Sequence, residues 1–349
     1  MDKAEVLKQS QRAYDQWGDL WRRNSSIAKN IPKVPMSALK NQGIGKHLVI
    51  VSMGGSFEKQ VEYLKQHQDK VDILAVDKAF VPLMEHGIRP DFVLIADARV
   101  SFSCYCEPFL KSTDDIILLS NVNANPDWAA NWKGIKTYYV NKDNIQSEVE
   151  FSRISGVQDQ IHAGSNVSNA ALIYANSVLN YDKYILLGFD FSWAIDGKFY
   201  SFSHGSEKMG NKSVGLASQK VLDRNYDMVN TSENLWFSSR WLDMYIQSEV
   251  GGKALNASDG ILEVPRIINL NDYLSAIKQY KRDLTDKETD LLARRTLVIK
   301  DKDSYDMAHD IITSKDAIML GGQLEYRLPI DMEVQKAIPS KYPEKVEAK

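Results

Sequence analysis

The chain has 349 residues, of which 44% are hydrophobic, so it is long enough to bury a large core and to form one large domain or two. Its 43 basic and 46 acidic residues give a formal net charge of −3, which excludes a global positive field that attracts nucleic acid or an anionic membrane. No stretch approaches about 18 apolar residues, and the charged N-terminus lacks the apolar core of a secretion signal. We therefore expect a cytoplasmic protein that does not enter a membrane.

The two cysteines, Cys104 and Cys106, are too few and too close for a disulfide framework or a zinc site by themselves, and we expect reduced thiols.

An amphipathic helix is expected at the N-terminus, because its apolar residues return at helical spacing. The residues close to one face are Val6, Ala13, Trp17, Leu20 and Trp21. Pro32 and Pro35 follow and punctuate the pattern. Residues 1–40 are therefore predicted to be a helical arm or cap on the main domain.

After this arm, short apolar runs alternate with helical patterns. The runs predicted to be strands are Leu48–Met53, Ile73–Val76, Phe92–Ala96, Ile116–Ser120, Lys136–Val140 and Tyr184–Gly188. Fully apolar strands that alternate with helices predict an α/β fold, with a Rossmann-like, mostly parallel sheet and helices on both faces. Ligands of such sheets bind outside the carboxyl ends of the strands.

The first strand runs directly into a pair of glycines. The stretch reads Met53-Gly54-Gly55-Ser56, and a helix with Ser56 as its N-cap is predicted to follow. One interpretation is a tight turn, since glycine adopts positive φ without strain. The other is close approach of the backbone to a ligand phosphate at the helix N-terminus.

The other predicted strands also end in polar residues. Asp77 and Lys78 follow the second strand, Asp97 follows the third and Asn121 follows the fourth. Asp190 stands in Leu187-Gly188-Phe189-Asp190-Phe191. Loops are polar in any case, so each residue alone is weak support for a site, whereas their joint placement indicates a ligand edge.

A second stretch of small polar residues leads into a predicted helix over 170–179. It contains Gly164, Ser165, Asn166 and Ser168. Such a helix start can bind an anion, and Ser165 or Asn166 can equally serve as its cap.

The order of these stretches resembles the MptE-like superfamily. The similarity covers about residues 40 to 265, and its most specific parts are Gly87-Ile88-Arg89-Pro90-Asp91, "AGSNVSNAA" and "LLGFDFSW". That superfamily joins archaeal hydroxymethylpterin diphosphokinases with motility-associated flagellin glycosyltransferases and distantly resembles bacterial sialyltransferases. The resemblance implies a transferase with a Rossmann-like catalytic domain.

The sialyltransferase-like branch implies a metal-independent transfer from a nucleotide-activated sugar. On that resemblance the donor lies across Gly54, Gly55 and Ser56 and across Gly164, Ser165 and Asn166. We expect Ser168, Asp77 and Asn121 also to contact the donor. His204, in "FYSFSHG", matches the histidine that deprotonates the acceptor hydroxyl, a task that suits its near-neutral pKa. Tyr200 and Ser203 are expected to donate hydrogen bonds to the leaving phosphate.

The second strand departs from that branch. Sialyltransferases carry an asparagine where this chain has Asp77, as in the flagellin-glycosylating branch. A carboxylate beside an anionic donor is unfavourable unless it binds a sugar hydroxyl or pairs with Lys78 or Arg99. The identity of the donor therefore stays open.

The diphosphokinase branch implies Mg²⁺ on ATP and several carboxylates at the third strand end. This chain offers Asp97 there, so that chemistry requires Asp97 and Asp190 as the ligands, with Asp77 as a further candidate. A third alternative is a nucleotide-binding module without turnover.

The predicted catalytic domain spans residues 41–268, and a helical C-terminal region with a disordered tail spans 269–349. The Gly/Ser/Lys-rich segment 205–219 is either a mobile lid or a surface insertion.

We predict a glycosyltransferase with His204, Asp190 and Asp97 as catalytic residues and no required cofactor. Its partners are a nucleotide-activated sugar and an acceptor that the sequence leaves open between a protein, a glycan and a modified nucleobase. No membrane partner is expected, and self-association through the C-terminal region is an open alternative.

Overall fold

The computed structural model describes residues 3–102, 109, 112–142, 145–164, 166–194, 197, 200–201 and 219–277. The predicted base His204, the predicted donor residue Ser165, nearly all of the segment 205–219 and the chain after residue 277 lie outside these residues, as do both cysteines. The described chain forms two compact units. Unit 1 comprises residues 41–93 and 163–277, and unit 2 comprises residues 3–40 and 94–162.

The fold is α/β, with a large parallel sheet and helices around it, as the alternating sequence pattern predicts. The strand order is β11-β10-β7-β1-β2 in unit 1 and β4-β5-β6 in unit 2. The pairings within these two series of strands are parallel. β3 (Phe92–Ile95) lies where the chain passes from one unit to the other.

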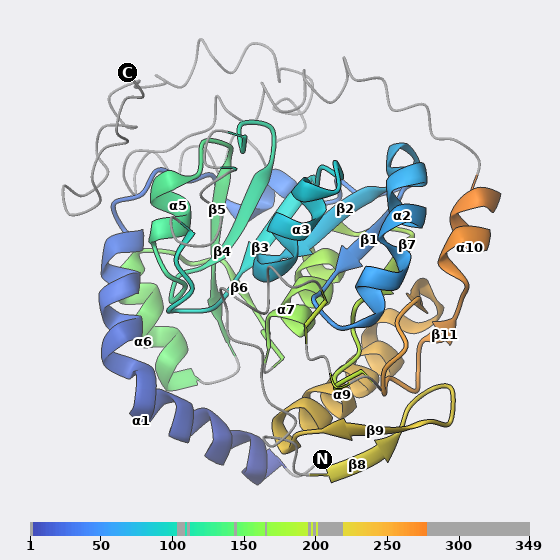
Figure 1. Cartoon of the computed structure of the whole chain (residues 1–349). Coiled ribbons are helices and arrows are strands. Elements are labelled where there is room, and N and C mark those ends of the chain that lie inside the picture. The colour runs from blue at the N-terminus through green and yellow to red at the C-terminus, as the bar shows by residue number, and fades with distance from the viewer. Residues whose placement is uncertain are drawn as a thin grey trace. The chain divides into compact units, whose positions relative to one another are not determined.

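Unit 1 contains the strands that precede the glycine-rich turn and the "GFDF" segment (Figure 1). Its strands are β1 (His47–Val51), β2 (Asp72–Val76), β7 (Lys183–Leu187), β10 (Ala254–Asn256) and β11 (Arg266–Ile267), with the antiparallel pair β8 (Gln219–Leu222) and β9 (Met228–Thr231). Its α-helices are α2 (Ser56–His67), α3 (Phe80–Glu85), α7 (Val167–Tyr174), α9 (Glu233–Tyr245) and α10 (Leu270–Ala276). Shorter helical turns are η2 (Gln68–Lys70), η3 (Asp77–Ala79) and η8 (Gly251–Lys253), and π-helical turns are η5 (Ala175–Leu179) and η7 (Ile246–Val250).

Unit 2 contains the N-terminal helix. Its elements are α1 (Lys3–Ala28), η1 (Met36–Leu39), β4 (Ile117–Asn121), α5 (Asp127–Asn131), β5 (Lys136–Asn141), α6 (Ile145–Ser155) and β6 (Gln160–Ile161). α1 packs on α6, where the Arg22 guanidinium lies 2.7 Å from a Glu150 carboxylate oxygen and Trp21 contacts Phe151 edge to face. The helix predicted at the N-terminus is confirmed.

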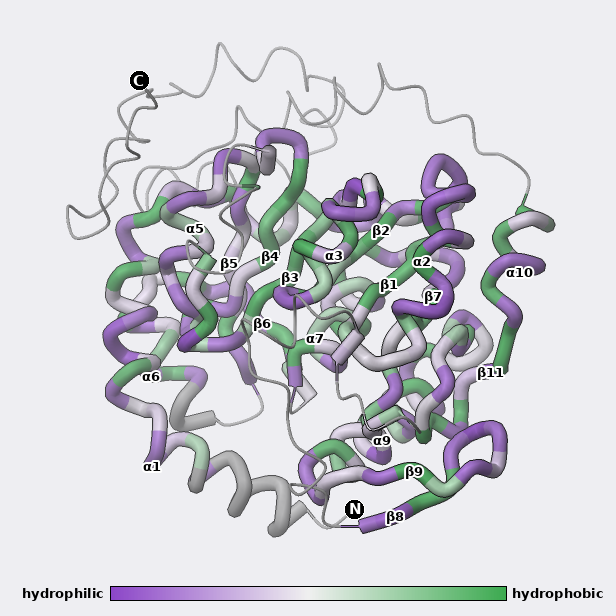
Figure 2. The backbone as a smooth tube through the Cα atoms, in the orientation of Figure 1, coloured by the Kyte–Doolittle hydropathy of each residue, from purple (hydrophilic) through white to green (hydrophobic). Residues whose placement is uncertain are grey.

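The registers bring the carboxyl ends of β1, β2 and β7 to one edge of unit 1. Leu48 pairs with Asp72 on one side and with Tyr184 on the other. The side chains from Leu48 to Val51 are fully buried, and the central strands are correspondingly hydrophobic in Figure 2. Burial on both faces explains why these strands read as uninterrupted apolar runs. All six predicted strands are confirmed to within a few residues.

Two details differ from the sequence expectation. The short strands β6, β10 and β11 and the β8–β9 pair were not predicted, because runs of two to four residues carry no readable periodicity. The prediction of Ser56 as an N-cap is wrong, since Gly55 occupies that position and Ser56 is the first residue of α2. The Ser56 hydroxyl is hydrogen-bonded to Asp190 instead.

Candidate functional site

The glycine turn after β1 packs directly against the segment that follows β7. The Gly54 amide donates to the Gly188 carbonyl oxygen at 2.9 Å. A Cβ at Gly54 would lie 2.6 Å from that oxygen and 2.6 Å from Asp190 Cγ, distances that real Cβ contacts do not reach. Gly188 has φ of +73°, and a Cβ there would lie 2.2 Å from the Ser52 carbonyl oxygen. The glycines are therefore required by the approach of two backbone segments within the protein itself.

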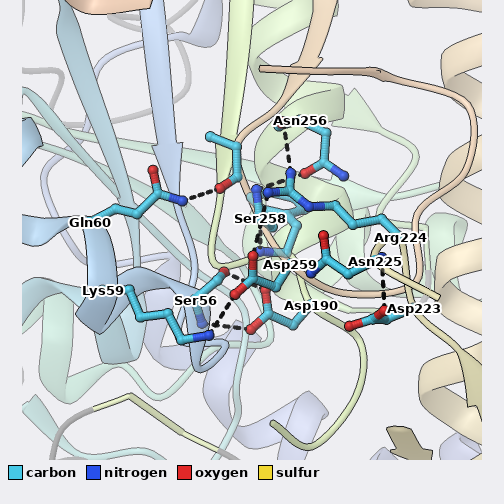
Figure 3. Close-up of polar contacts among 12 residues, drawn as sticks. Ser56, Lys59, Gln60, Asp190, Asp223, Arg224, Asn225, Asn256, Ser258 and Asp259 are labelled. Atoms are coloured by element: carbon cyan, nitrogen blue, oxygen red, sulfur yellow. Dashed lines mark hydrogen bonds and ion pairs between the residues drawn. The ribbon is translucent and has the colours of Figure 1, made fainter. Parts of the chain in front are cut away.

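Asp190 occupies the N-terminus of α2. Its carboxylate accepts a 2.8 Å hydrogen bond from the Ser56 amide and a second, short one from the Ser56 hydroxyl. Figure 3 shows these two side chains facing each other. A carboxylate in this position satisfies an amide that the helix leaves unpaired and interacts favourably with the helix dipole.

The Asp190 side chain is 4% exposed. Burial raises the pKa of Asp190 to about 6, and the hydrogen bonds from Ser56 oppose that rise. A smaller rise comes from the nearby Asp259 carboxylate and a smaller drop from Lys59. Asp190 therefore changes protonation close to neutral pH, in a range where general acids and bases operate.

Ser201 closes the other side of the glycine turn. Its amide donates to the Met53 carbonyl oxygen at 2.9 Å, and its buried hydroxyl donates to the Gly54 carbonyl oxygen and accepts from the Glu58 amide. These contacts hold the neighbouring residue Tyr200 beside the turn. The chain around Ser201 thus links the glycine turn to the segment that precedes the predicted base.

Tyr200 pairs with Lys78 at the carboxyl end of β2. The Lys78 ammonium donates to the Tyr200 hydroxyl oxygen at 2.8 Å and lies 4.5 Å from the centre of the tyrosine ring. Asp77, the preceding residue, is buried, and its carboxylate accepts from the Lys78 amide at 2.7 Å. A cation and a phenol therefore stand together next to the glycine turn.

The second predicted anion site is the start of α7. Asn166 is the N-cap, and its side-chain oxygen accepts from the Asn169 amide at 2.9 Å. The Ser168 hydroxyl is paired with the Ser52 hydroxyl at 2.7 Å, which connects the start of α7 to the end of β1. Gly164 has φ of +59°, and a Cβ there would lie 2.5 Å from the Trp241 ring. The prediction that Asn166 caps this helix is confirmed. Glycine is required at position 164 because a larger residue would collide with the Trp241 ring.

A polar cluster at the end of β10 was not predicted (Figure 3). Asp259 lies between the Lys59 ammonium at 2.7 Å and the Arg224 guanidinium at 3.4 Å. The guanidinium also donates to the Asn256 carbonyl oxygen at 3.3 Å. The sequence does carry a signal for this cluster, because the residues after Leu255 are polar like those at the other strand ends. The signal was missed because β10 is too short to be recognised as a strand.

The remaining predicted residues, Asp97 and Asn121, belong to unit 2. The Asp97 carboxylate accepts from the Arg99 amide at 2.8 Å and the Val100 amide at 3.3 Å. The buried Asn121 side chain accepts from the Asn123 amide at 2.8 Å. Both residues therefore organise the turns that follow their own strands.

The side chains of the described ranges contain no group of three or more His, Cys, Asp or Glu placed to hold a metal ion. None of the helices seen in those ranges is long and apolar enough to span a bilayer.

Comparisons with known proteins agree with this architecture. The model of a family described as 6-hydroxymethylpterin diphosphokinase MptE-like matches residues 25–196, which confirms the resemblance drawn from the sequence motifs. An uncharacterized protein of Treponema pallidum (strain Nichols) is 31% identical over 83 residues, covering 24% of this chain and 40% of that protein.

A solved structure, that of the MAf glycosyltransferase from Magnetospirillum magneticum AMB-1, superposes with a TM-score of 0.59 at 17% identity. The superposition covers 92% of this chain and 52% of that one. The chain thus spans about half the length of this structure and less than half of the Treponema protein. At 17% identity, the likeness to the solved structure shows a shared fold.

Proposed function

We propose, on the premise that residues 25–196 are MptE-like, that this chain transfers a sugar from a nucleotide-activated donor to an acceptor hydroxyl. The likeness to the fold of a glycosyltransferase supports this class of reaction. The whole chain is needed to test it, because the family match ends close to Tyr200 and before His204.

The observation that carries the proposal is the Lys78–Tyr200 pair beside the glycine turn. A donor nucleotide is anionic, and a lysine ammonium binds phosphate as a point charge. A tyrosine hydroxyl carries one O–H donor, which can stabilise charge that develops on a leaving phosphate. Both groups stand at the carboxyl edge of the parallel strands, where ligands of such sheets bind.

In this proposal His204 is the general base and Asp190 is a positioning residue. Asp190 fixes the first turn of α2 through Ser56, and that turn in turn contacts Ser201, the neighbour of Tyr200. Asp77 is proposed to orient Lys78 through its backbone amide. The catalytic role expected of Asp97 and the donor contact expected of Asn121 stay predictions.

The proposed reaction balances without a metal. The acceptor oxygen attacks the anomeric carbon, the bond from that carbon to the phosphate oxygen breaks, and the electron pair leaves with the nucleotide. The acceptor proton passes to His204. Lys78 and Tyr200 stabilise the negative charge on the departing phosphate.

The description of the matching family favours one second candidate, a diphosphokinase. That reaction transfers a diphosphoryl group from Mg²⁺-bound ATP to an alcohol and needs oxygen ligands for the metal. In unit 1, both carboxylate oxygens of Asp190 already accept hydrogen bonds from Ser56, so Asp190 would have to share them with the ion.

The experiment that tests the proposal is calorimetric titration of the full chain with CMP-, UDP- and GDP-linked sugars, with and without EDTA, and with ATP plus Mg²⁺. Lys78→Met removes a charge-assisted contact, and we expect it to weaken binding of the sugar nucleotide by about 10- to 100-fold. Lys65→Met is the matched control, because Lys65 lies exposed on the adjacent helix α2.

Equal affinities of Lys78→Met and wild type for every sugar nucleotide would refute the proposed site. Binding of ATP with Mg²⁺ alone would favour the diphosphokinase. Binding of a sugar nucleotide without any turnover would identify the chain as a binding module.

A further inference from the structure

Two buried hydrogen-bond donors at the end of β10 have no acceptor among the described residues. They are Arg224 Nε and Asn256 Nδ2. Asn256 is 1% exposed and the Arg224 side chain is 14% exposed, so bulk water does not replace the missing partners. An unsatisfied buried donor costs about 1–3 kcal/mol, and native structures rarely leave two in one place.

Hydrogen bonds fix the positions of Arg224 and Asn256. The Arg224 amide donates to the Gly260 carbonyl oxygen at 3.0 Å, and its guanidinium donates to the Asn256 carbonyl oxygen at 3.3 Å. The Asn256 side-chain oxygen accepts from the Ser258 amide at 2.9 Å, which fixes the orientation of the amide. The guanidinium and the Asn256 side chain lie next to each other in Figure 3.

The groups around the pair include two cations, Lys59 and Arg224, and the carboxylates of Asp190, Asp223 and Asp259. Asp259 is shared between two cations, Lys59 and Arg224, so these three groups carry a net positive charge. The two other carboxylates in Figure 3 have hydrogen bonds of their own. Asp190 accepts from Ser56, and Asp223 accepts from the backbone amides of Asn225 and Asp227.

The position is also one where ligands bind. Asn256 is the last residue of β10, which pairs in parallel with β7, so it lies at the carboxyl edge of the sheet in unit 1. Lys59 reaches this edge from the first turns of α2, where the helix dipole adds positive potential.

We propose that Arg224 Nε and Asn256 Nδ2 form a donor pair that binds an oxyanion of a ligand, either a carboxylate or a phosphate, with Lys59 contributing charge. The two N–H groups match the lone pairs of an oxyanion, which accepts and does not donate. This subsite uses residues other than Lys78 and Tyr200, and its test is independent of the proposed donor.

The test is titration of the full chain with sodium phosphate, pyrophosphate and acetate. Binding is measured by calorimetry and by the change in melting temperature. Asn256→Asp is nearly isosteric and replaces the N–H donor by an acceptor that repels an oxyanion. Arg224→Lys keeps the charge and removes Nε. We expect each change to weaken binding by about tenfold or more, as for loss of one charge-assisted hydrogen bond.

Arg240→Lys is the matched control. Arg240 also lies between two carboxylates, those of Asp243 at 3.5 Å and Glu263 at 2.6 Å, but it belongs to α9 and is no part of the donor pair. Circular dichroism of each variant without ligand verifies that it is folded, and Arg224→Lys serves if Asn256→Asp does not fold.

Phosphate binding that both variants weaken would assign the subsite to a phosphate, and acetate binding that both variants weaken would assign it to a carboxylate. The proposal is overturned if none of the three anions binds wild type, since a bridging water would then satisfy the donors. It is equally overturned if both variants bind the anion as tightly as the Arg240→Lys control.

Discussion

The requirement for glycine at position 54 gives the sharpest prediction about stability. In Gly54→Ala, the new Cβ would lie 2.6 Å from both Asp190 Cγ and the Gly188 carbonyl oxygen. Neither neighbour moves easily, because the Asp190 carboxylate is hydrogen-bonded to Ser56 and the Gly188 backbone packs so closely on Ser52 that a Cβ on Gly188 would lie 2.2 Å from the Ser52 carbonyl oxygen. Overpacking of a rigid site costs about 1–3 kcal/mol, and we expect the upper part of that range.

The assay is urea unfolding followed by tryptophan fluorescence and circular dichroism. A loss of 1 kcal/mol corresponds to a drop in Tm of about 1–2 °C for a chain of 349 residues. Gly252→Ala is the control, because Gly252 is exposed and a Cβ there meets nothing within 4 Å. If Gly54→Ala is as stable as Gly252→Ala, the close approach of the two segments does not explain the glycine pair, and contact with a ligand would have to explain it.

Two further predictions concern Asp190 and Asn166. Burial raises the pKa of Asp190 from 3.8 to about 6, so the folded protein keeps a proton that the unfolded chain has released, and the resulting stability is lost as the pH rises through about 6. Asp190→Asn still accepts from the Ser56 amide and is expected to remove that loss, which amounts to about 3 kcal/mol between about pH 3 and pH 7. Urea unfolding across this range measures the effect, and an unchanged pH profile would contradict the buried carboxylate. Asn166→Ala is expected to lower stability by about 1 kcal/mol through loss of the α7 cap, whereas Asn166→Asp retains it; equal denaturation midpoints for the two variants would contradict the capping role.

The fold could be predicted wherever burial leaves a pattern in the sequence. Strands β1, β2 and β7 are recognisable because both of their faces are covered, which demands continuous apolar residues. β10 and β11 belong to the same sheet but pair over two or three residues. Their position depends on tertiary contacts and not on a local pattern.

The candidate site could be predicted only as a set of strand ends. The sequence predicted that Gly54, Ser56 and Asp190 lie at one edge, and the structure brings them together within unit 1. The sequence could not predict that the Asp190 carboxylate accepts a hydrogen bond from Ser56 at the start of α2, since Ser56 and Asp190 are 134 positions apart. The Arg224–Asn256 pair was missed for the same reason, because Arg224 and Asn256 are 32 positions apart in the sequence.

The most direct test of the proposed transfer is to measure nucleotide released from CMP-, UDP- and GDP-linked sugars by the full chain in the presence of EDTA, with His204→Ala in parallel. The account predicts that one of these sugars is turned over without a metal and that His204→Ala binds it but releases little nucleotide. Release of AMP from ATP, dependent on Mg²⁺ and without turnover of any sugar nucleotide, would contradict it.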